Sequence, residues 1–468
     1  MGDYDIILVQ VPLLAKEYSE PEELEFYDKY WGIFGRVVER DMFKVPIYDV
    51  KELPLWIAAL GATLEQNDMD VRVLDLSPYG GVNVDYEAIR KELETCSSPV
   101  FALSSFTNNF SVCVKISKLI KDIFGESATV VVGGAHASNT AELCLMHGSI
   151  DIVCRGEGER AIPDIVKCIK NGKPISQVCG ISWKKEDGGV VHNPAASTRI
   201  LPDELPLPAY HLIPQTYRGI ISFARIYTSR GCAYNCAYCA DTLWSNRKPI
   251  HQTLERTLKQ VEAMHNLFDI DLFYVGDESF TYNKSYVQDF GSEMIKRNFK
   301  WISQTRTDLI TPEILNVMKE SNCKLIKFGA ESANQHLLNK IRKGITVESI
   351  RKACYMAKSA GLNVLLYWMV GLPDESRETA ENTIQYAENL FNDKLIDLVE
   401  YYITTPYPGT DLYANPNKYN IEIIGKDFDE WREDRPSVTN TQYLSRDEIF
   451  QIWKQGLSRF AKCMEGLR

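Results

Sequence analysis

The chain has 468 residues, which is too long for one ordinary hydrophobic core and predicts at least two domains. Hydrophobic residues make up 45% and charged residues 25%, as in soluble globular proteins. Because the sequence shows no apolar run of membrane-spanning length and no leader, we expect a cytoplasmic protein without membrane contact. A net charge of -11 without a clustered Lys/Arg excess argues against nucleic acid as a partner.

The first third of the chain alternates apolar, strand-like runs with segments of helical periodicity. The runs are nearly continuous in Val, Ile and Leu, which is typical of parallel strands covered by helices on both faces. We therefore predict an N-terminal, doubly wound, Rossmann-like α/β domain over residues 1–170. An aromatic and charged insertion at residues 11–52 interrupts the pattern. The predicted strands are 5–10, 71–76, 99–104, 129–134 and 150–154.

The pattern breaks at residues 171–220, where a hairpin turning at 187–189 precedes a Pro-rich stretch. We take this segment as a linker. Six further strand-helix units then predict a partial βα barrel over residues 221–414, and a short helical extension over 415–468. In such barrels the chemistry lies at the C-terminal ends of the strands. The predicted barrel strands are 223–228, 272–275, 300–306, 325–328, 364–370 and 398–404.

Three of the twelve cysteines stand apart, since the other nine are scattered through apolar patterns typical of core residues. Cys232, Cys236 and Cys239 follow the first barrel strand on one short loop, a spacing that predicts a metal site. Structural zinc would need a fourth ligand, and His251 is the nearest candidate. A [4Fe-4S] cluster on three thiolates leaves one iron open for an outside ligand, which favours catalysis over a four-ligand electron carrier or sensor.

Other residues at predicted strand ends are candidates for ligand binding. Gln304 and Arg306 lie two apart on a strand, so both point into the barrel, where Arg306 can pair with a carboxylate. In the first domain, the Gly-rich segments 133–138 and 155–159 each follow a parallel strand and let the backbone approach a ligand. They do not form a dinucleotide fingerprint, and two tight turns without a ligand remain the alternative.

The Cys-x3-Cys-x-aromatic-Cys loop after a first barrel strand resembles the signature of the radical S-adenosylmethionine (SAM) superfamily. The resemblance implies that the open iron chelates SAM, and that an electron from the cluster cleaves SAM to a 5'-deoxyadenosyl radical. It also implies that residues at successive strand ends contact SAM. These residues are Tyr238, Gly276, Asp277, Glu278, Gln304, Arg306, Glu331 and Gly371.

Segments 53–60, 71–75, 133–136, 155–159 and 404–410 resemble landmarks of the radical SAM subfamily that carries a cobalamin-binding domain. The resemblance implies cobalamin as a further cofactor. The Asp-x-His-x-x-Gly sequence that supplies a cobalt ligand in many cobalamin proteins is absent, so His136 either binds cobalt or forms a hydrogen bond near the corrin tail. The implied cobalamin contacts are Ser104, Ser105, Thr107, Gly133, Gly134, His136, Gly156 and Glu157.

The subfamily includes methyltransferases and the anaerobic magnesium-protoporphyrin ester cyclase. We therefore expect an enzyme that abstracts hydrogen from an unactivated carbon of a small-molecule or natural-product substrate and transfers a methyl group to it. The alternative is a non-methylating radical reaction, such as cyclisation, rearrangement, epimerisation or dehydration, with or without cobalamin. Either reaction requires a reductant such as flavodoxin or ferredoxin. No catalytic residue, substrate or oligomeric state follows from the sequence.

Overall fold

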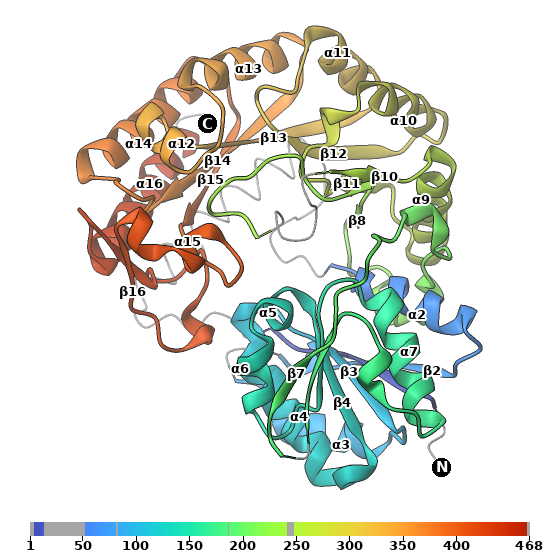
Figure 1. Cartoon of the computed structure of the whole chain (residues 1–468). Coiled ribbons are helices and arrows are strands. Elements are labelled where there is room, and N and C mark those ends of the chain that lie inside the picture. The colour runs from blue at the N-terminus through green and yellow to red at the C-terminus, as the bar shows by residue number, and fades with distance from the viewer. Residues whose placement is uncertain (1–3, 14–51, 81–82, 186, 241–247, 466–468) are drawn as a thin grey trace. The chain divides into compact units, whose positions relative to one another are not determined.

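The computed structural model describes residues 4–13, 52–80, 83–185, 187–240 and 248–465 (Figure 1). Most of the aromatic insertion therefore lies outside the described residues. The chain divides into two compact units. The first unit comprises Met1–Glu17, Pro54–Gln215 and Asp427–Asp429, and the second comprises Tyr18–Leu53, Thr216–Lys426 and Glu430–Arg468.

A seven-stranded sheet in the order β2-β1-β3-β4-β5-β6-β7 forms the centre of the first unit. The first five strands are parallel, in the order 2-1-3-4-5 of doubly wound folds, so the order reverses between β1 and β3. Ligands bind such sheets at the carboxyl ends of the strands near this reversal. The strands are β1 (Ile6–Gln10), β2 (Val71–Asp75), β3 (Val100–Ser104), β4 (Thr129–Gly133) and β5 (Ile152–Cys154).

Helices cover both faces of this sheet, because alternate residues of each strand point to opposite sides. Ile7 and Val9 of β1 pack in one apolar cluster with α3, α4 and α6, whereas Ile6 and Leu8 pack in another with α2 and α7. The predicted doubly wound architecture is therefore confirmed. The helices are α2 (Leu55–Gln66), α3 (Tyr86–Glu94), α4 (Phe110–Phe124), α5 (Gly134–Asn139), α6 (Ala141–Met146) and α7 (Gly158–Lys170).

The hairpin that we assigned to a linker belongs to the first sheet. Strands β6 (Ile181–Lys184) and β7 (Val190–His192) are antiparallel, and β6 pairs with β5. Without this hairpin β5 would be an edge strand with unpaired backbone groups. The first unit accordingly continues to Gln215 instead of ending near residue 170.

Six parallel strands form the sheet of the second unit, in the sequential order β8-β11-β12-β13-β14-β15. In the described residues β8 and β15 do not pair with each other, so the barrel is partial, as predicted. The strands are β8 (Ala224–Ile226), β11 (Leu272–Val275), β12 (Lys300–Thr305), β13 (Cys323–Glu331), β14 (Asn363–Val370) and β15 (Leu398–Ile403).

Helices follow the strands of this sheet and line its outer side (Figure 1). Most of them begin at a residue whose side chain caps the first turn; Thr253, for example, accepts a hydrogen bond from Arg256 N–H. The helices are α9 (Leu254–Phe268), α10 (Lys284–Lys296), α11 (Pro312–Glu320), α12 (Gln335–Lys340), α13 (Val347–Ser359) and α14 (Arg377–Asn392).

The C-terminal segment contains strands as well as the predicted helices. Strands β16 (Ile421–Ile423) and β17 (Thr439–Thr441) pair antiparallel between the short helix α15 (Asp411–Ala414) and α16 (Arg446–Glu465). Helix α16 packs on β15 and α14, where Trp453 donates a hydrogen bond of 2.7 Å to the Tyr401 carbonyl. Among the described helices, none combines the length and apolar character needed to cross a lipid bilayer.

Candidate active site

The cysteine loop begins where β8 ends, and Asp277 fixes its base. This carboxylate, just after β11, accepts hydrogen bonds from Thr228 N–H (2.6 Å), Thr228 Oγ1 (2.5 Å) and Ser229 Oγ (2.7 Å). Burial raises the pKa of Asp277, whereas these hydrogen bonds oppose that shift. Asp277, which we expected to face SAM, instead joins the ends of two neighbouring strands.

Residues far along the chain hold the rest of the loop. Ala237 N–H donates to the Ile341 carbonyl at 2.9 Å, and its own carbonyl accepts from Leu412 N–H at 3.1 Å. Arg342 Nε donates to the Asn235 carbonyl at 3.0 Å. The loop is therefore anchored at its base by Asp277 and near its middle by the segment that follows α12.

The three thiols fit an iron-sulfur cluster in number and position. Cys236 is buried, while Cys232 and Cys239 are half-buried. Within the described part of the chain no three His, Cys, Asp or Glu side chains gather closely enough to hold a single metal ion. Thiolates that bind a [4Fe-4S] cluster coordinate different irons, so such convergence is not required of them.

A cavity of about 740 Å³ opens inside the partial barrel, next to the cysteine loop. Because strand side chains alternate, every second residue of the parallel strands faces this space. Its polar lining includes charged, amide and tyrosine side chains from all six strands, from the cysteine loop, from the segment after α12 and from the C-terminal segment. These residues are Arg225, Tyr238, Tyr274, Glu278, Gln304, Arg306, Lys327, Glu331, Lys343, Tyr367, Glu400, Tyr402 and Glu433.

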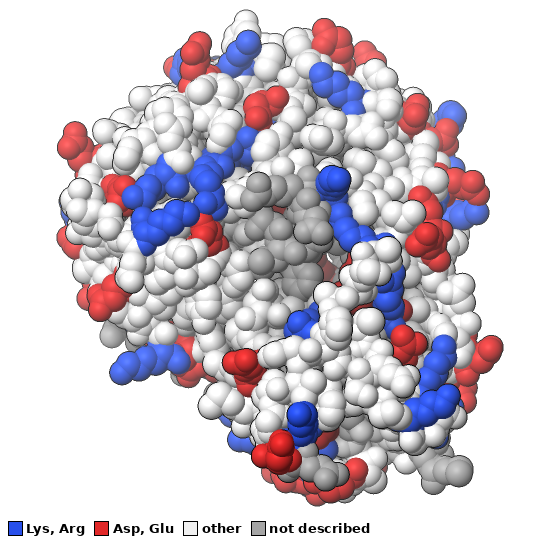
Figure 2. Space-filling view, viewed as in Figure 1, with Lys and Arg blue, Asp and Glu red and all other residues white. Residues whose placement is uncertain are grey.

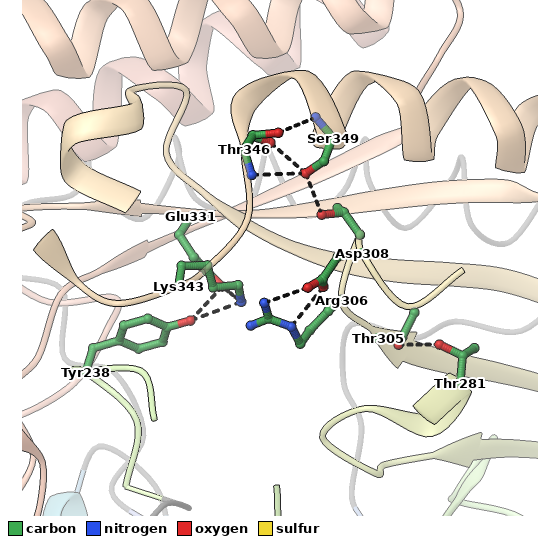
Figure 3. Close-up of polar contacts among 10 residues, drawn as sticks. Tyr238, Thr281, Thr305, Arg306, Asp308, Glu331, Lys343, Thr346 and Ser349 are labelled. Atoms are coloured by element: carbon green, nitrogen blue, oxygen red, sulfur yellow. Dashed lines mark hydrogen bonds and ion pairs between the residues drawn. The ribbon is translucent and has the colours of Figure 1, made fainter. Parts of the chain in front are cut away.

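Tyr238, Glu331 and Lys343 form a buried polar group beside Cys239 (Figure 3). Tyr238 OH donates to Glu331 Oε1 at 2.8 Å, and Lys343 Nζ lies 2.6 Å from the same oxygen. Burial alone would lower the pKa of Lys343, but the neighbouring Glu331 and Cys236 outweigh it and raise this pKa. The sequence pattern missed Lys343, since nothing in its local surroundings marks it as a partner of Glu331.

Arg306 has a carboxylate partner, as the sequence led us to expect, but that partner is its neighbour Asp308. Arg306 Nε and Nη2 lie 2.9 Å and 3.1 Å from the two Asp308 oxygens. The guanidinium also stacks 3.6 Å from the centroid of the Tyr234 ring, which belongs to the cysteine loop. Only 4% of Arg306 is exposed, and its contact with Tyr234 supports the cysteine loop. Figure 3 shows this pair alongside the Thr281–Thr305 hydrogen bond of 2.7 Å.

The structure brings some of the expected SAM residues to the cavity and leaves others outside its lining. Tyr238, Glu278, Gln304, Arg306 and Glu331 line it. Gly276, Asp277 and Gly371 do not.

The two glycines have packing roles. A Cβ on Gly276 would lie 3.0 Å from Arg225 and Tyr227. Gly371 has φ of +79°, and a Cβ there would lie 2.9 Å from Ile449 of α16. The backbone conformation at Gly371 therefore requires glycine, and close packing at Gly276 favours it, without any ligand.

In the first unit, the expected cobalamin residues lie at the carboxyl ends of β3 and β4. His136 is 1% exposed, its Nδ1 lies 3.2 Å from Thr107 Oγ1, and its ring contacts Phe110 and Phe428 at centroid distances of 4.4 Å and 4.7 Å. Burial lowers the pKa of His136 to about 4. Gly134 has φ of +94°, and a Cβ there would lie 2.7 Å from the Ser105 carbonyl oxygen, so only glycine fits this position.

Among the described residues, two buried polar atoms at this edge have no hydrogen-bond partner: His136 Nε2 and Asn108 Oδ1. Buried polar groups are rarely left unpaired, so the edge retains unused hydrogen-bonding capacity where a doubly wound sheet binds its ligand. In this respect the edge, with Ser104, Ser105 and Gly133 beside it, fits a bound cofactor. Sequence reasoning missed Asn108.

Gly156 and Glu157 have other partners. Gly156 N–H donates to Ser138 Oγ at 3.2 Å, and Glu157 Oε2 accepts from Ile200 N–H at 3.1 Å. Both therefore connect segments of the first unit.

Sequence comparison agrees with both parts of the chain. The Radical SAM superfamily matches residues 226–387, and the B12 binding domain matches residues 48–166. An uncharacterized methyltransferase of Pyrococcus horikoshii is 31% identical over 414 residues, 87% of each chain. The anaerobic magnesium-protoporphyrin IX monomethyl ester cyclase of Rubrivivax gelatinosus is 26% identical over 424 residues, covering 87% of this chain and 73% of the cyclase.

Solved structures share the fold. TsrM, a radical SAM methyltransferase of Kitasatospora setae with cobalamin and a [4Fe-4S] cluster bound, superposes with a TM-score of 0.66 at 16% identity, over 87% of this chain and 74% of TsrM. The cobalamin-dependent radical SAM enzyme OxsB superposes with a TM-score of 0.71 at 19% identity, over 95% of this chain and 65% of OxsB.

A partial βα barrel with an open three-cysteine loop, joined to a doubly wound domain, defines a class of enzymes that work with an iron-sulfur cluster and a second bound cofactor. The chain belongs to the radical SAM superfamily, in the group whose members also carry a B12-binding domain. Its cofactors are a [4Fe-4S] cluster, SAM and cobalamin.

Proposed function

We propose that this enzyme methylates an unactivated carbon of a small-molecule substrate. The observation that carries the proposal is the 31% identity to a methyltransferase over 87% of both chains, which spans both cofactor-binding regions. When bound, the cluster and SAM supply a 5'-deoxyadenosyl radical, and cobalamin supplies the methyl group. The protein's own contribution is to bind, orient and shield these groups.

The polar group around Glu331 supports a role in holding SAM. Oε1 of Glu331 is already bonded to Tyr238 and Lys343, whereas Oε2 has no hydrogen bond among the described residues. A carboxylate fixed in this way has one oxygen ready to accept from a ligand hydroxyl or amine. Gln304 and Glu278 line the same cavity and add further polar groups for SAM.

Arg306 and Tyr234 have a positioning role in this proposal. Their stacking holds the cysteine loop against the carboxyl end of β12. In the first unit, Asn108 and His136 provide the unpaired polar atoms that cobalamin would satisfy.

A non-methylating radical reaction is the second candidate, because the cyclase of Rubrivivax gelatinosus matches nearly the same share of this chain. The methylating reaction is favoured by the higher identity to the Pyrococcus horikoshii methyltransferase, and by 25% identity to a hopanoid C-3 methylase of Methylococcus capsulatus over 78% of this chain. Either reaction takes its electron from a reductant such as flavodoxin or ferredoxin.

On the face drawn in Figure 2, acidic side chains lie among the basic ones, as the 63 acidic and 52 basic residues lead one to expect.

The test is anaerobic reconstitution of the full chain with iron, sulfide and hydroxocobalamin. The protein is then reduced with dithionite in the presence of SAM carrying an isotopically labelled methyl group. We expect near-stoichiometric corrin, formation of 5'-deoxyadenosine, and label in the corrin. A corrin without label, alongside 5'-deoxyadenosine, would favour the non-methylating reaction.

A matched pair of cysteine variants controls this experiment. Cys236→Ser should lose the cluster and all 5'-deoxyadenosine, because only two thiolates would remain for the cluster. Cys179→Ser removes an exposed cysteine of the first unit and should behave as wild type. If Cys236→Ser still cleaved SAM, the cluster assignment would be wrong.

A further inference from the structure

Strand β13 points four residues into the cavity, and one of them is a lysine with no role in the SAM site. Leu325, Lys327, Gly329 and Glu331 alternate along the strand and all line the cavity. Lys327 precedes Glu331 by four residues, so their Cα atoms lie about 13 Å apart along the strand. Lys327 therefore faces the half of the cavity nearer the amino ends of the strands, away from the cysteine loop. We call this half the deeper half of the cavity.

Aromatic rings surround the Lys327 ammonium. Its Nζ lies 4.8 Å from the centroid of the Tyr274 ring and 5.6 Å from that of the Tyr367 ring. Arg225 also packs on Tyr274, with its guanidinium carbon 4.4 Å from the ring centroid. One tyrosine ring thus contacts two cations.

Among the described residues, only one of these two cations has an acidic partner. Arg225 Nε and Nη2 lie 2.9 Å and 2.6 Å from the two oxygens of Glu52. Within the residues that the structure describes, no carboxylate lies within ion-pair distance of Lys327. The other cations of the cavity, Arg306 and Lys343, are paired with Asp308 and Glu331.

A positive charge that faces a protein interior is disfavoured unless an opposite charge or a hydrogen-bond acceptor approaches it. Contacts with aromatic rings compensate only part of that cost. The carboxylate of Glu400, which accepts a hydrogen bond from Tyr402, lies on β15, two strands from β13 in the sheet. Its negative charge disfavours a ligand anion on that wall, and this repulsion is weaker beside Lys327.

We propose that Lys327 anchors an anionic group of the substrate, a carboxylate or a phosphate, in the deeper half of this cavity. The inference rests on the proposed function, because it assumes that the cavity admits a small-molecule substrate beside SAM. Tyr274 and Tyr367 form the walls around the anchored group and keep the ammonium directed into the cavity. The substrate class is therefore an organic acid or a phosphorylated small molecule.

The test uses benzoate and inorganic phosphate as probes on the reconstituted full-length enzyme. Excess SAM without reductant fills the SAM site first, so that the probes cannot bind there. Isothermal titration calorimetry should show that at least one probe binds the wild-type enzyme, and should show which anion the site prefers. In Lys327→Met the Kd should rise by about tenfold or more, while Lys327→Arg should retain binding.

Lys324→Met is the matched control, because Lys324 lies on the opposite face of the same strand. It should bind the probe as wild type does. The anchor is refuted if neither probe binds the wild-type enzyme, or if Lys327→Met binds as tightly as Lys324→Met. Dithionite-driven formation of 5'-deoxyadenosine is measured on the wild-type enzyme and on Lys324→Met without probe. Its absence from the wild-type enzyme would instead contradict the proposed function.

Discussion

Lys343 and Glu331 form a buried ion pair at the carboxyl end of β13, with Nζ 2.6 Å from Oε1 and with 8% and 7% of the two side chains exposed. Glu331 is the last residue of β13, whereas Lys343 follows α12. Tyr238 donates to the same oxygen from the cysteine loop. The pair therefore connects the sheet, the segment after α12 and the loop that holds the cluster.

Lys343→Met should reduce the free energy of unfolding by about 3–5 kcal/mol, because removal of one partner leaves a buried carboxylate without its counter-charge. Urea denaturation of the full-length chain without cofactors measures the effect. The double variant Lys343→Met/Glu331→Gln should recover at least half of the loss, since it carries no unpaired charge. If the single variant were as stable as wild type, water in the cavity would already solvate Glu331.

Asp277→Asn should weaken the base of the cysteine loop. The amide has one acceptor oxygen for the three donors that now share the carboxylate, so the free energy of unfolding should fall by about 1.5–3 kcal/mol. Iron and sulfide per chain after reconstitution should fall as well. Asp289→Asn, on the exposed side of α10, is the control and should match wild type. Full cluster content in Asp277→Asn would show that the loop does not depend on this clamp.

Glu375 should make the stability of the second unit depend on pH. It is fully buried, its Oε2 accepts from Gly371 N–H at 2.6 Å, and burial raises its pKa to about 8 from 4.5. The unfolded chain ionises this carboxyl at lower pH than the folded chain does. Its stabilising contribution is therefore complete below pH 4.5 and is lost as the pH rises toward 8.

The variant that tests this effect is Glu375→Gln. Relative to it, the wild-type free energy of unfolding should fall by up to about 1.4 kcal/mol per pH unit over that range. Urea denaturation at several pH values measures the slope. The exposed Glu378→Gln should follow wild type at every pH. Parallel curves for wild type and Glu375→Gln would mean that Glu375 is ionised in the folded chain.

His136 should not bind cobalt. Its Nδ1 is engaged by Thr107 and its ring packs against Phe110 and Phe428, so we expect the remaining Nε2 to form a hydrogen bond with cobalamin instead of coordinating cobalt. Electron paramagnetic resonance of the cob(II)alamin-loaded protein should show no splitting by a histidine nitrogen, and His136→Gln should give the same spectrum. Nitrogen splitting present in wild type and lost in His136→Gln would establish His136 as a cobalt ligand.

Much of the fold could be predicted because strand and helix patterns are local. Alternation of strand-like and helix-like segments correctly predicted all the parallel strands of both sheets, and alternation of side chains along β12 correctly directed Gln304 into the cavity. The sequence also predicted the hairpin turn at 187–189. It did not predict that the first strand of this hairpin, β6, pairs with β5. Sheet pairing depends on which edge remains open after the domain has folded, and no local pattern records that.

For the site too, some features follow from the sequence and others only from the tertiary structure. The sequence by itself determined the class of enzyme, because the spacing of three cysteines is a local property that sets how many iron positions the protein can occupy. Only the tertiary structure decided that Asp277 clamps the loop, that Lys343 pairs with Glu331 and that Lys327 faces the cavity with no acidic partner among the described residues. Each of these roles depends on which charges lie within a few ångströms. Packing between distant segments sets those distances, and electrostatic interactions in a poorly solvated interior make them decisive.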